Sequence, residues 1–345
     1  MKEALIQVRD LTKEFSVGKG FLKKARPLRA VSHVSFDIMP GETLCLVGES
    51  GCGKSTLGRC ILQLIKPTSG QVLYAGQDLC ALEEKAMRPY RQDLQMIFQD
   101  PYASLNPRMT VREIVGAPLD VFGLAASRAE KEAKIREICN IVGISEEWLD
   151  KYPHEFSGGQ RQRIVISRAL ILDPKFVVCD EPVSALDVSI RSQVLNLMKD
   201  IQNHYGFSYL FISHDLSVVN YIGDRIAVMY LGQLVELADK GELFKNPLHP
   251  YTQALLSAIP VADVTYQRER TYLEGDVPSP LDPPSGCKFR TRCPYAAPEC
   301  AAQEPAFTDA GGSHFVACHR CGDAQKGTGT DPATINDQKD QEEKP

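Results

Sequence analysis

A short apolar run, LCLV at residues 44–47, leads directly into the segment GESGCGKST at residues 48–56. The segment fits the pattern G-x-x-x-x-G-K-[ST], in which glycines let the backbone wrap tightly and point N–H groups at phosphate oxygens. The lysine of this pattern reaches the β- and γ-phosphates, and the hydroxyl after it binds Mg²⁺. We therefore expect a strand, a phosphate-binding loop and a helix in succession, with these residues contacting a nucleotide: Gly48, Glu49, Ser50, Gly51, Cys52, Gly53, Lys54, Ser55 and Thr56.

Two carboxylates follow another apolar run. The segment FVVC at residues 176–179 precedes Asp180 and Glu181. In phosphate-transferring folds an aspartate at the carboxyl end of a strand holds Mg²⁺, and a following glutamate can polarise the attacking water. Two acids that merely enter a loop are the alternative, which the phosphate-binding loop upstream makes less favourable. We predict Asp180 and Ser55 as magnesium ligands and Glu181 as a catalytic residue.

The apolar pattern predicts an α/β fold. Short or alternating apolar runs indicate strands, and residues 105–172 have mainly helical spacing, with Ser127 as the N-cap of one helix. Later strands alternate with helical patterns, which is typical of a parallel sheet with crossover helices. The expected strands lie at residues 4–9, 32–38, 44–47, 71–76, 94–98, 176–179, 209–213 and 225–230.

The amino-acid composition changes after Tyr230, where prolines become frequent. We expect the chain after Tyr230 to add no further strand to the sheet. Residues 1–260 are expected to form the main domain, and residues 261–321 a C-terminal extension. Residues 322–345 have hardly any apolar side chains, so we expect a disordered tail there.

Charge and hydropathy exclude several classes of protein. The 345-residue chain has a formal charge of −5, which argues against a basic face for nucleic acid. It contains no run of about 20 apolar residues that could span a membrane, and its start lacks the apolar core of a signal peptide. We therefore expect a cytosolic chain that binds no nucleic acid.

Four further motifs occur in a fixed order: Gln99 in FQDP, the segment FSGGQRQR at Phe156–Arg163, SALD at Ser184–Asp187, and His214 in ISHD. With the phosphate-binding loop, these motifs make the chain resemble the nucleotide-binding subunits of ATP-binding cassette (ABC) transporters over residues 4–260. The resemblance implies a P-loop NTPase cassette with a RecA-like core, an antiparallel β subdomain and an inserted α-helical subdomain at about residues 100–172.

The resemblance also implies roles for single residues. Gln99 would bind ATP and Mg²⁺, His214 would act with Glu181 in catalysis, and Phe15 would stack on adenine unless it is a core residue. A second group would contact the ATP held by a second ABC ATPase subunit, which can be a paralogue or an identical copy, so that two subunits close around two ATP molecules. This group comprises Ser157, Gly158, Gly159, Gln160 and Asp187.

The segments HPYTQALLSAIP at 249–260 and DPPSGCKFRTRCPYAAPEC at 282–300 resemble the C-terminal extension of ABC subunits from dipeptide and oligopeptide permeases, which nickel importers share. In this extension Cys287, Cys293, Cys300 and Cys318 follow C-x₅-C-x₆-C-x₁₇-C, and Cys321 could replace Cys318. Proline-rich loops with little hydrophobic core need additional stabilisation, such as a bound metal centre. We expect a [4Fe–4S] cluster, with Zn²⁺ or no metal as alternatives.

The resemblance implies an ATPase coupled to import of di- or oligopeptides. Nickel import and a soluble, non-transport ABC ATPase are the alternatives, and peptide length stays open. The expected partners are two transmembrane permease subunits, the second ATPase subunit and an extracytoplasmic substrate-binding protein. The chain would then lie as a peripheral subunit on the cytoplasmic face of the cell membrane.

Overall fold

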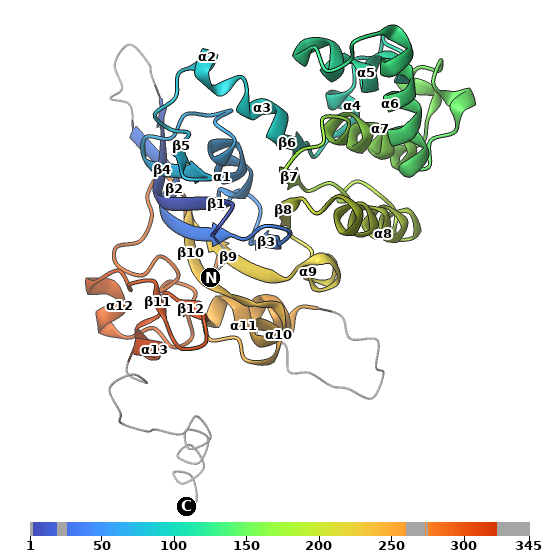
Figure 1. The fold of residues 1–345 in the computed structure, drawn as a ribbon. Helices are drawn as coiled ribbons and strands as arrows, with labels where there is room; N and C mark the ends of the chain where they lie inside the picture. Colours follow the sequence, from blue (N-terminus) through green and yellow to red (C-terminus); the bar gives the residue numbers. More distant parts are fainter. Residues whose placement is uncertain (1–2, 19–25, 260–272, 274, 323–345) are drawn as a thin grey trace, which may run out of the picture.

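The computed structural model describes residues 3–18, 26–259, 273 and 275–322 of the chain (Figure 1). It contains a four-stranded sheet of order β2-β1-β4-β5 and an eight-stranded sheet of order β11-β12-β10-β9-β3-β8-β7-β6. The predicted disordered tail falls almost entirely on residues 323–345, which lie outside the described residues. No helix in the described part of the chain has both the length and the apolar character needed to cross a membrane.

The centre of the large sheet is parallel and fully buried. Every residue of β3 (Thr43–Val47), β7 (Phe176–Asp180) and β8 (Ser208–Ser213) is buried, as expected for a parallel sheet covered on both faces. Alternate residues serve opposite cores: Cys45 and Val47 pack in one cluster, Leu44 and Leu46 in the other. The parallel part is completed by β6 (Leu94–Ile97) and β9 (Arg225–Tyr230), and its helices are α1 (Lys54–Ile61), α8 (Val188–Tyr205) and α9 (Leu216–Ile222).

The small sheet is antiparallel, as the ABC resemblance implies. Two of its strands exceed the predicted lengths, because register shifts let a long bent pair continue through polar sequence. It consists of β1 (Ile6–Val17), β2 (Arg26–Ile38), β4 (Ser69–Tyr74) and β5 (Gln77–Asp78), followed by the short helices α2 (Glu84–Met87) and α3 (Tyr90–Asp93).

The predicted helical region forms a separate group beside the β6 edge of the large sheet (Figure 1). It comprises α4 (Pro101–Ser104), α5 (Val111–Phe122), α6 (Arg128–Ile141), α7 (Gly158–Leu170) and two 3₁₀ turns, Glu146–Trp148 and Pro153–Glu155. Ser127 caps α6 as predicted, since its side chain accepts a hydrogen bond from the Glu130 N–H group.

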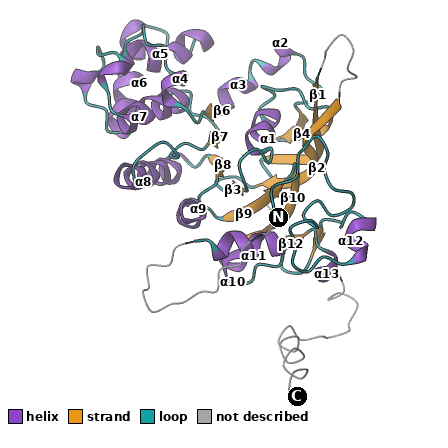
Figure 2. Ribbon diagram, turned by 180° about the vertical axis from the view of Figure 1, so that it is seen from behind, coloured by secondary structure: helices purple, strands orange, loops and turns teal. Residues whose placement is uncertain are grey.

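The expectation that the chain after Tyr230 adds no strand is wrong. Strand β10 (Gln233–Asp239) pairs with β9, and β12 (Phe315–Val316) pairs with β10 and with β11 (Thr308–Asp309). The remaining helices are α10 (Lys240–Lys245), α11 (Pro250–Ser257), α12 (Pro298–Ala302) and α13 (His319–Gly322), which Figure 2 shows from behind. We refer to residues 275–322 as the extension.

The predicted [4Fe–4S] cluster is wrong, and its zinc alternative is equally without support. Among the described residues no group of three or more His, Cys, Asp or Glu side chains could hold a metal ion, and Cys287, Cys293, Cys300 and Cys318 are free thiols. Burial raises the pKa of the Cys287 thiol to about 11. The expected need for additional stabilisation does not arise, because the extension shares the core of the large sheet.

Phe289 makes that shared core. Its side chain is 1% exposed and belongs to the buried cluster of the large sheet. Its ring centroid lies 5.3 Å from that of Tyr230 and 5.4 Å from that of Tyr251, in tilted or edge-to-face contacts that aromatic rings favour. Phe289 therefore anchors one end of the proline-rich segment to the large sheet, and β12 anchors the other by pairing with β10.

Candidate nucleotide site

The glycine-rich segment forms a tight loop between β3 and α1. Gly48 and Gly53 have φ angles of 152° and 108°, which side chains of L residues rarely adopt. A Cβ atom at Gly48 would lie 2.1 Å from the carbonyl oxygen of Met229, and one at Gly53 would lie 2.0 Å from that of Ala30. The loop is therefore packed against β2 and β9 at a distance that only glycine allows.

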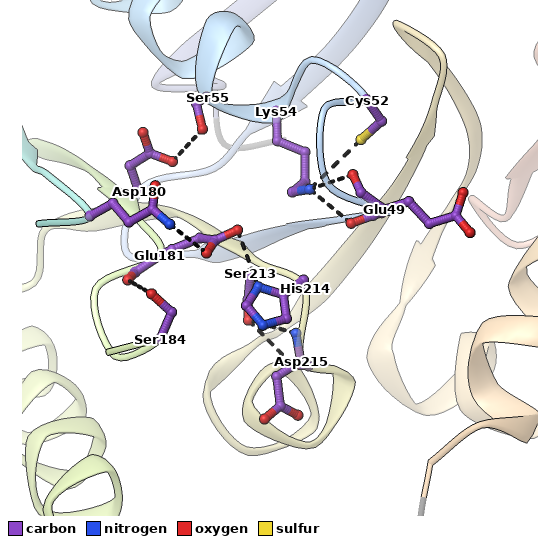
Figure 3. A network of polar contacts seen from close by, with 12 residues as sticks. Glu49, Cys52, Lys54, Ser55, Asp180, Glu181, Ser184, Ser213, His214 and Asp215 are labelled. Carbon is purple, nitrogen blue, oxygen red and sulfur yellow. Dashed lines mark hydrogen bonds and ion pairs between the residues drawn. The ribbon is translucent and has the colours of Figure 1, made fainter. Parts of the chain in front are cut away.

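Lys54 is the first residue of α1, and it is 5% exposed. Its ammonium group donates hydrogen bonds to the carbonyl oxygens of Gly48 at 2.8 Å and Glu49 at 2.9 Å. Figure 3 shows the side chain folded back across the loop. The charge is thus held inside the ring of backbone groups that the sequence predicts as the phosphate site.

Ser55 and Asp180 meet at the carboxyl end of β7, as predicted. The Ser55 hydroxyl donates to Oδ1 of Asp180 at 2.6 Å. Asp180 is 1% exposed, and its Oδ2 accepts no hydrogen bond from any described residue, although Nη2 of Arg59 lies 3.6 Å away. Burial raises the pKa of Asp180. A buried carboxylate oxygen without a donor, next to a hydroxyl, is a donor set that suits a hard divalent cation.

Three predicted residues from distant motifs converge next to this pair. Nε2 of Gln99 donates to Oε2 of Glu181 at 3.0 Å. Nδ1 of His214 lies 3.2 Å from Oε1 of the same carboxylate, as Figure 3 shows. Glu181 follows β7, and its backbone N–H group donates to the carbonyl oxygen of Ile212 at 3.0 Å. The glutamate carboxylate is therefore held from both sides at the edge of the parallel sheet.

These groups open onto one cavity of about 600 Å³. Phe15, 37% exposed, lines it, with the Lys13 ammonium 5.0 Å from the ring centroid. The sequence gives no signal for several other lining residues, which come from β2, from the turn after β9 and from the extension. They are Leu28, Arg29, Ala30, Leu231, Gly232 and Pro280.

The FSGGQ segment lies elsewhere. Ser157 caps α7, where it and Gln160 form a reciprocal capping box, and α7 lies in the helical group away from α1 (Figure 1). Asp187 caps α8 by accepting a hydrogen bond from the Ile190 N–H group at 3.0 Å. Neither segment is among the described residues that line the cavity. Within one chain, the predicted residues thus divide into two separate sets.

Comparison with family models identifies both parts of the chain. Residues 31–184 match the model described as "ABC transporter". Residues 235–300 match the model described as "Oligopeptide/dipeptide transporter, C-terminal region". The second match begins within β10 and ends within the extension.

Curated relatives match nearly over their full length. The chain is 53% identical over 322 residues to the oligopeptide transport ATP-binding protein AppF of Bacillus subtilis, covering 92% of this chain and 98% of the relative. It is 49% identical over 322 residues to the oligopeptide transport ATP-binding protein OppF of Escherichia coli, covering 92% and 96%.

Solved structures confirm the cassette fold predicted from the sequence. The ATP-binding cassette MJ0796, in a dimeric post-hydrolysis state bound to ADP and Pi, matches with a TM-score of 0.61 and 28% identity, covering 68% of this chain and 98% of that chain. The protein cbiO1 of Clostridium perfringens, part of an ABC transporter complex, matches with a TM-score of 0.61 and 25% identity, covering 71% and 92%. The chain therefore belongs to the ATP-binding subunits of ABC transporters, within the group that carries the oligopeptide and dipeptide transporter C-terminal region.

Proposed function

We propose that this chain hydrolyses ATP to power an importer of di- and oligopeptides across the cytoplasmic membrane. The observation that carries the proposal is the convergence of Lys54, Glu181 and His214 on one cavity. Ser55 lines the same cavity and donates a hydrogen bond to Asp180. The C-terminal part of the chain matches the peptide transporter region. Relatives at about half identity are named oligopeptide transport ATP-binding proteins, which supports peptides over nickel.

The nucleotide is held by the loop and by Phe15. The N–H groups of the loop and the N-terminus of α1 face the phosphates, while the Lys54 ammonium group exchanges its carbonyl partners for phosphate oxygens. Ser55, Asp180 and Gln99 offer the hydroxyl, carboxylate and amide oxygens that would hold Mg²⁺. When bound, this ion neutralises charge that develops on the β- and γ-phosphates.

Glu181 performs the proton chemistry. Its carboxylate takes a proton from the water that attacks the γ-phosphorus. The new O–P bond to that water forms while the bond from the γ-phosphorus to the bridging oxygen breaks, ADP leaves with that oxygen, and the proton passes to the released phosphate. His214 and Gln99 contact the two carboxylate oxygens and fix their direction. The products are ADP and inorganic phosphate.

The second set of residues acts on a partner subunit. Ser157 and Gly158 lie at the N-terminus of a helix, where N–H groups attract anions, and they lie outside the cavity of their own chain. We infer that they contact ATP held by a second ATPase subunit, and that two permease subunits and an extracytoplasmic binding protein complete the importer. The chain is then a peripheral subunit on the cytoplasmic face.

Transport can be measured directly with proteoliposomes. We expect vesicles that contain the chain with its permease, partner ATPase and binding protein to accumulate a radiolabelled tetrapeptide when ATP is present on the side of the ATPase. Peptide-loaded binding protein should also raise ATP hydrolysis. Accumulation of Ni²⁺ in place of peptide would support the nickel alternative, and hydrolysis that is independent of the permease would refute coupling to transport.

A substitution at Gly158 tests the shared site. A Cβ atom there would meet only Leu186 at an ordinary 3.5 Å, and an acidic side chain in a first helical turn is favourable. We expect Gly158→Asp to bind ATP normally as an isolated chain. In the assembled complex its carboxylate would repel the partner's ATP and lower hydrolysis by roughly tenfold or more. Hydrolysis at the normal rate by the assembled variant would contradict the shared-site arrangement, and Gly158→Ala is the matched control.

A further inference from the structure

The phosphate-binding loop contains a carboxylate of its own. Glu49 follows Gly48 in the loop, and its carbonyl oxygen accepts a hydrogen bond from Lys54. Glu49 does not line the cavity itself, but it directly precedes Ser50, which does, so a bound triphosphate would place several negative charges within reach of its side chain. Because like charges repel most strongly where solvent is limited, an uncompensated carboxylate at this position opposes nucleotide binding.

Arg292, in the extension, compensates this charge. Its Nη1 lies 2.8 Å from Oε2 and 3.1 Å from Oε1 of Glu49, and its Nη2 lies 3.1 Å from Oε1. The arginine side chain is 8% exposed and the glutamate side chain 27%. A bidentate contact of this kind neutralises the carboxylate and also fixes the direction in which it points. Figure 3 shows the Glu49 carboxylate turned away from Lys54.

The extension and α11 hold the loop together. The Tyr251 hydroxyl of α11, outside the extension, accepts a hydrogen bond from the Glu49 N–H group at 2.9 Å. The turn that carries Arg292 is anchored by Phe289, since the Arg292 N–H group donates to the Phe289 carbonyl oxygen at 3.0 Å. The neighbouring Lys288 donates to the carbonyl oxygen of Leu231, which lines the cavity, at 3.3 Å.

We propose that Arg292 is a positioning residue for the nucleotide site, which neutralises Glu49 and directs its carboxylate away from the phosphates. The extension then contributes to the ATP site through Arg292. This inference rests on the proposed ATPase function. Any partner or modification that moves the extension would then change the affinity of the site for nucleotide.

A charge-removal series with a fluorescent ATP analogue tests the proposal on the full-length chain. We expect Arg292→Gln to raise the dissociation constant about tenfold, since Glu49 then faces the phosphates unpaired. Glu49→Gln should change it by less than about threefold, because the repelling charge is gone. The decisive variant is the double substitution Glu49→Gln/Arg292→Gln, which should restore affinity to nearly that of the unmodified chain.

Arg290→Gln is the matched control, because Arg290 lies on the same turn and its side chain donates its hydrogen bonds within the described structure to Ser285 alone. A double variant that binds as weakly as Arg292→Gln alone would show a merely structural role and overturn the proposal, as would normal binding by Arg292→Gln. If Arg292→Gln does not fold, Arg292→Lys replaces it, because lysine keeps the positive charge but cannot make the bidentate contact. Its dissociation constant must then lie between that of the unmodified chain and the roughly tenfold higher value expected for loss of the charge. Because nucleotide binding is measured without permease or peptide, its outcome does not depend on whether the chain powers peptide import.

Discussion

Replacing Glu181 by glutamine is expected to reduce ATP turnover in the assembled transporter by about 10²–10⁴-fold, the usual contribution of a general base. Glutamine has the same shape, so contacts with Gln99 and His214 can persist while the acceptor for the water proton is lost. Nucleotide binding should remain, because the loop, Lys54 and Ser55 are unchanged. The measurement is steady-state phosphate release, with binding of a fluorescent ATP analogue measured in parallel.

Glu146→Gln is a suitable control, because Glu146 lies in the helical group with its side chain 63% exposed and pairs with Arg136. It should leave phosphate release unchanged. Normal turnover by Glu181→Gln would reject the assigned role. A Glu181→Gln variant that neither binds nor hydrolyses ATP would indicate that the carboxylate is needed for the architecture of the site.

Replacing Lys54 by alanine is expected to fail at an earlier step. The substitution removes the buried ammonium group that contacts two loop carbonyl oxygens, so both the charge facing the phosphates and the internal support of the loop are lost. We expect ATP affinity to fall by about 100-fold, which corresponds to the two or three charge-assisted hydrogen bonds that one ammonium makes to phosphate. Titration with the fluorescent analogue measures this loss.

Lys66→Ala is the control for the loss of a lysine close to α1. The Lys66 ammonium donates to the carbonyl oxygen of Leu82, outside the cavity, so ATP affinity should not change. Equal affinity of Lys54→Ala and the unmodified chain would contradict the assignment. Together, the two substitutions separate binding of the nucleotide from its hydrolysis.

The convergence of the candidate site residues could be predicted because its determinants are local. Gly48, Gly53 and Lys54 stand in one segment, while Asp180 ends a buried strand and Glu181 follows it. Parallel strands bring their carboxyl ends to one edge of a sheet, so motifs far apart in sequence meet there without further information. The positions of Gln99 and His214 followed from their order relative to these motifs.

The extension could not be predicted in the same way. Its packing includes Phe289 against Tyr230 and Tyr251, a contact that no spacing in the sequence reveals. The Glu49–Arg292 pair joins residues 243 positions apart. The cysteine spacing favours a metal centre only if the proline-rich segment has no other way to become ordered. That condition does not apply here, because the segment packs on the large sheet.

Strand β12 has a consequence for the solubility of the chain. It pairs with Glu236 and Leu237 in the middle of β10, a strand of seven residues, and the sheet then ends on β11, which has only two. Unpaired backbone groups on a long outer strand are a template for pairing with other molecules, whereas a two-residue strand offers almost none. A chain cut before residue 315 would leave that flank of β10 uncovered, with its apolar Leu237 beside unpaired N–H and carbonyl groups. The extension thus shortens the unpaired edge of the large sheet and lowers its tendency to pair with other chains.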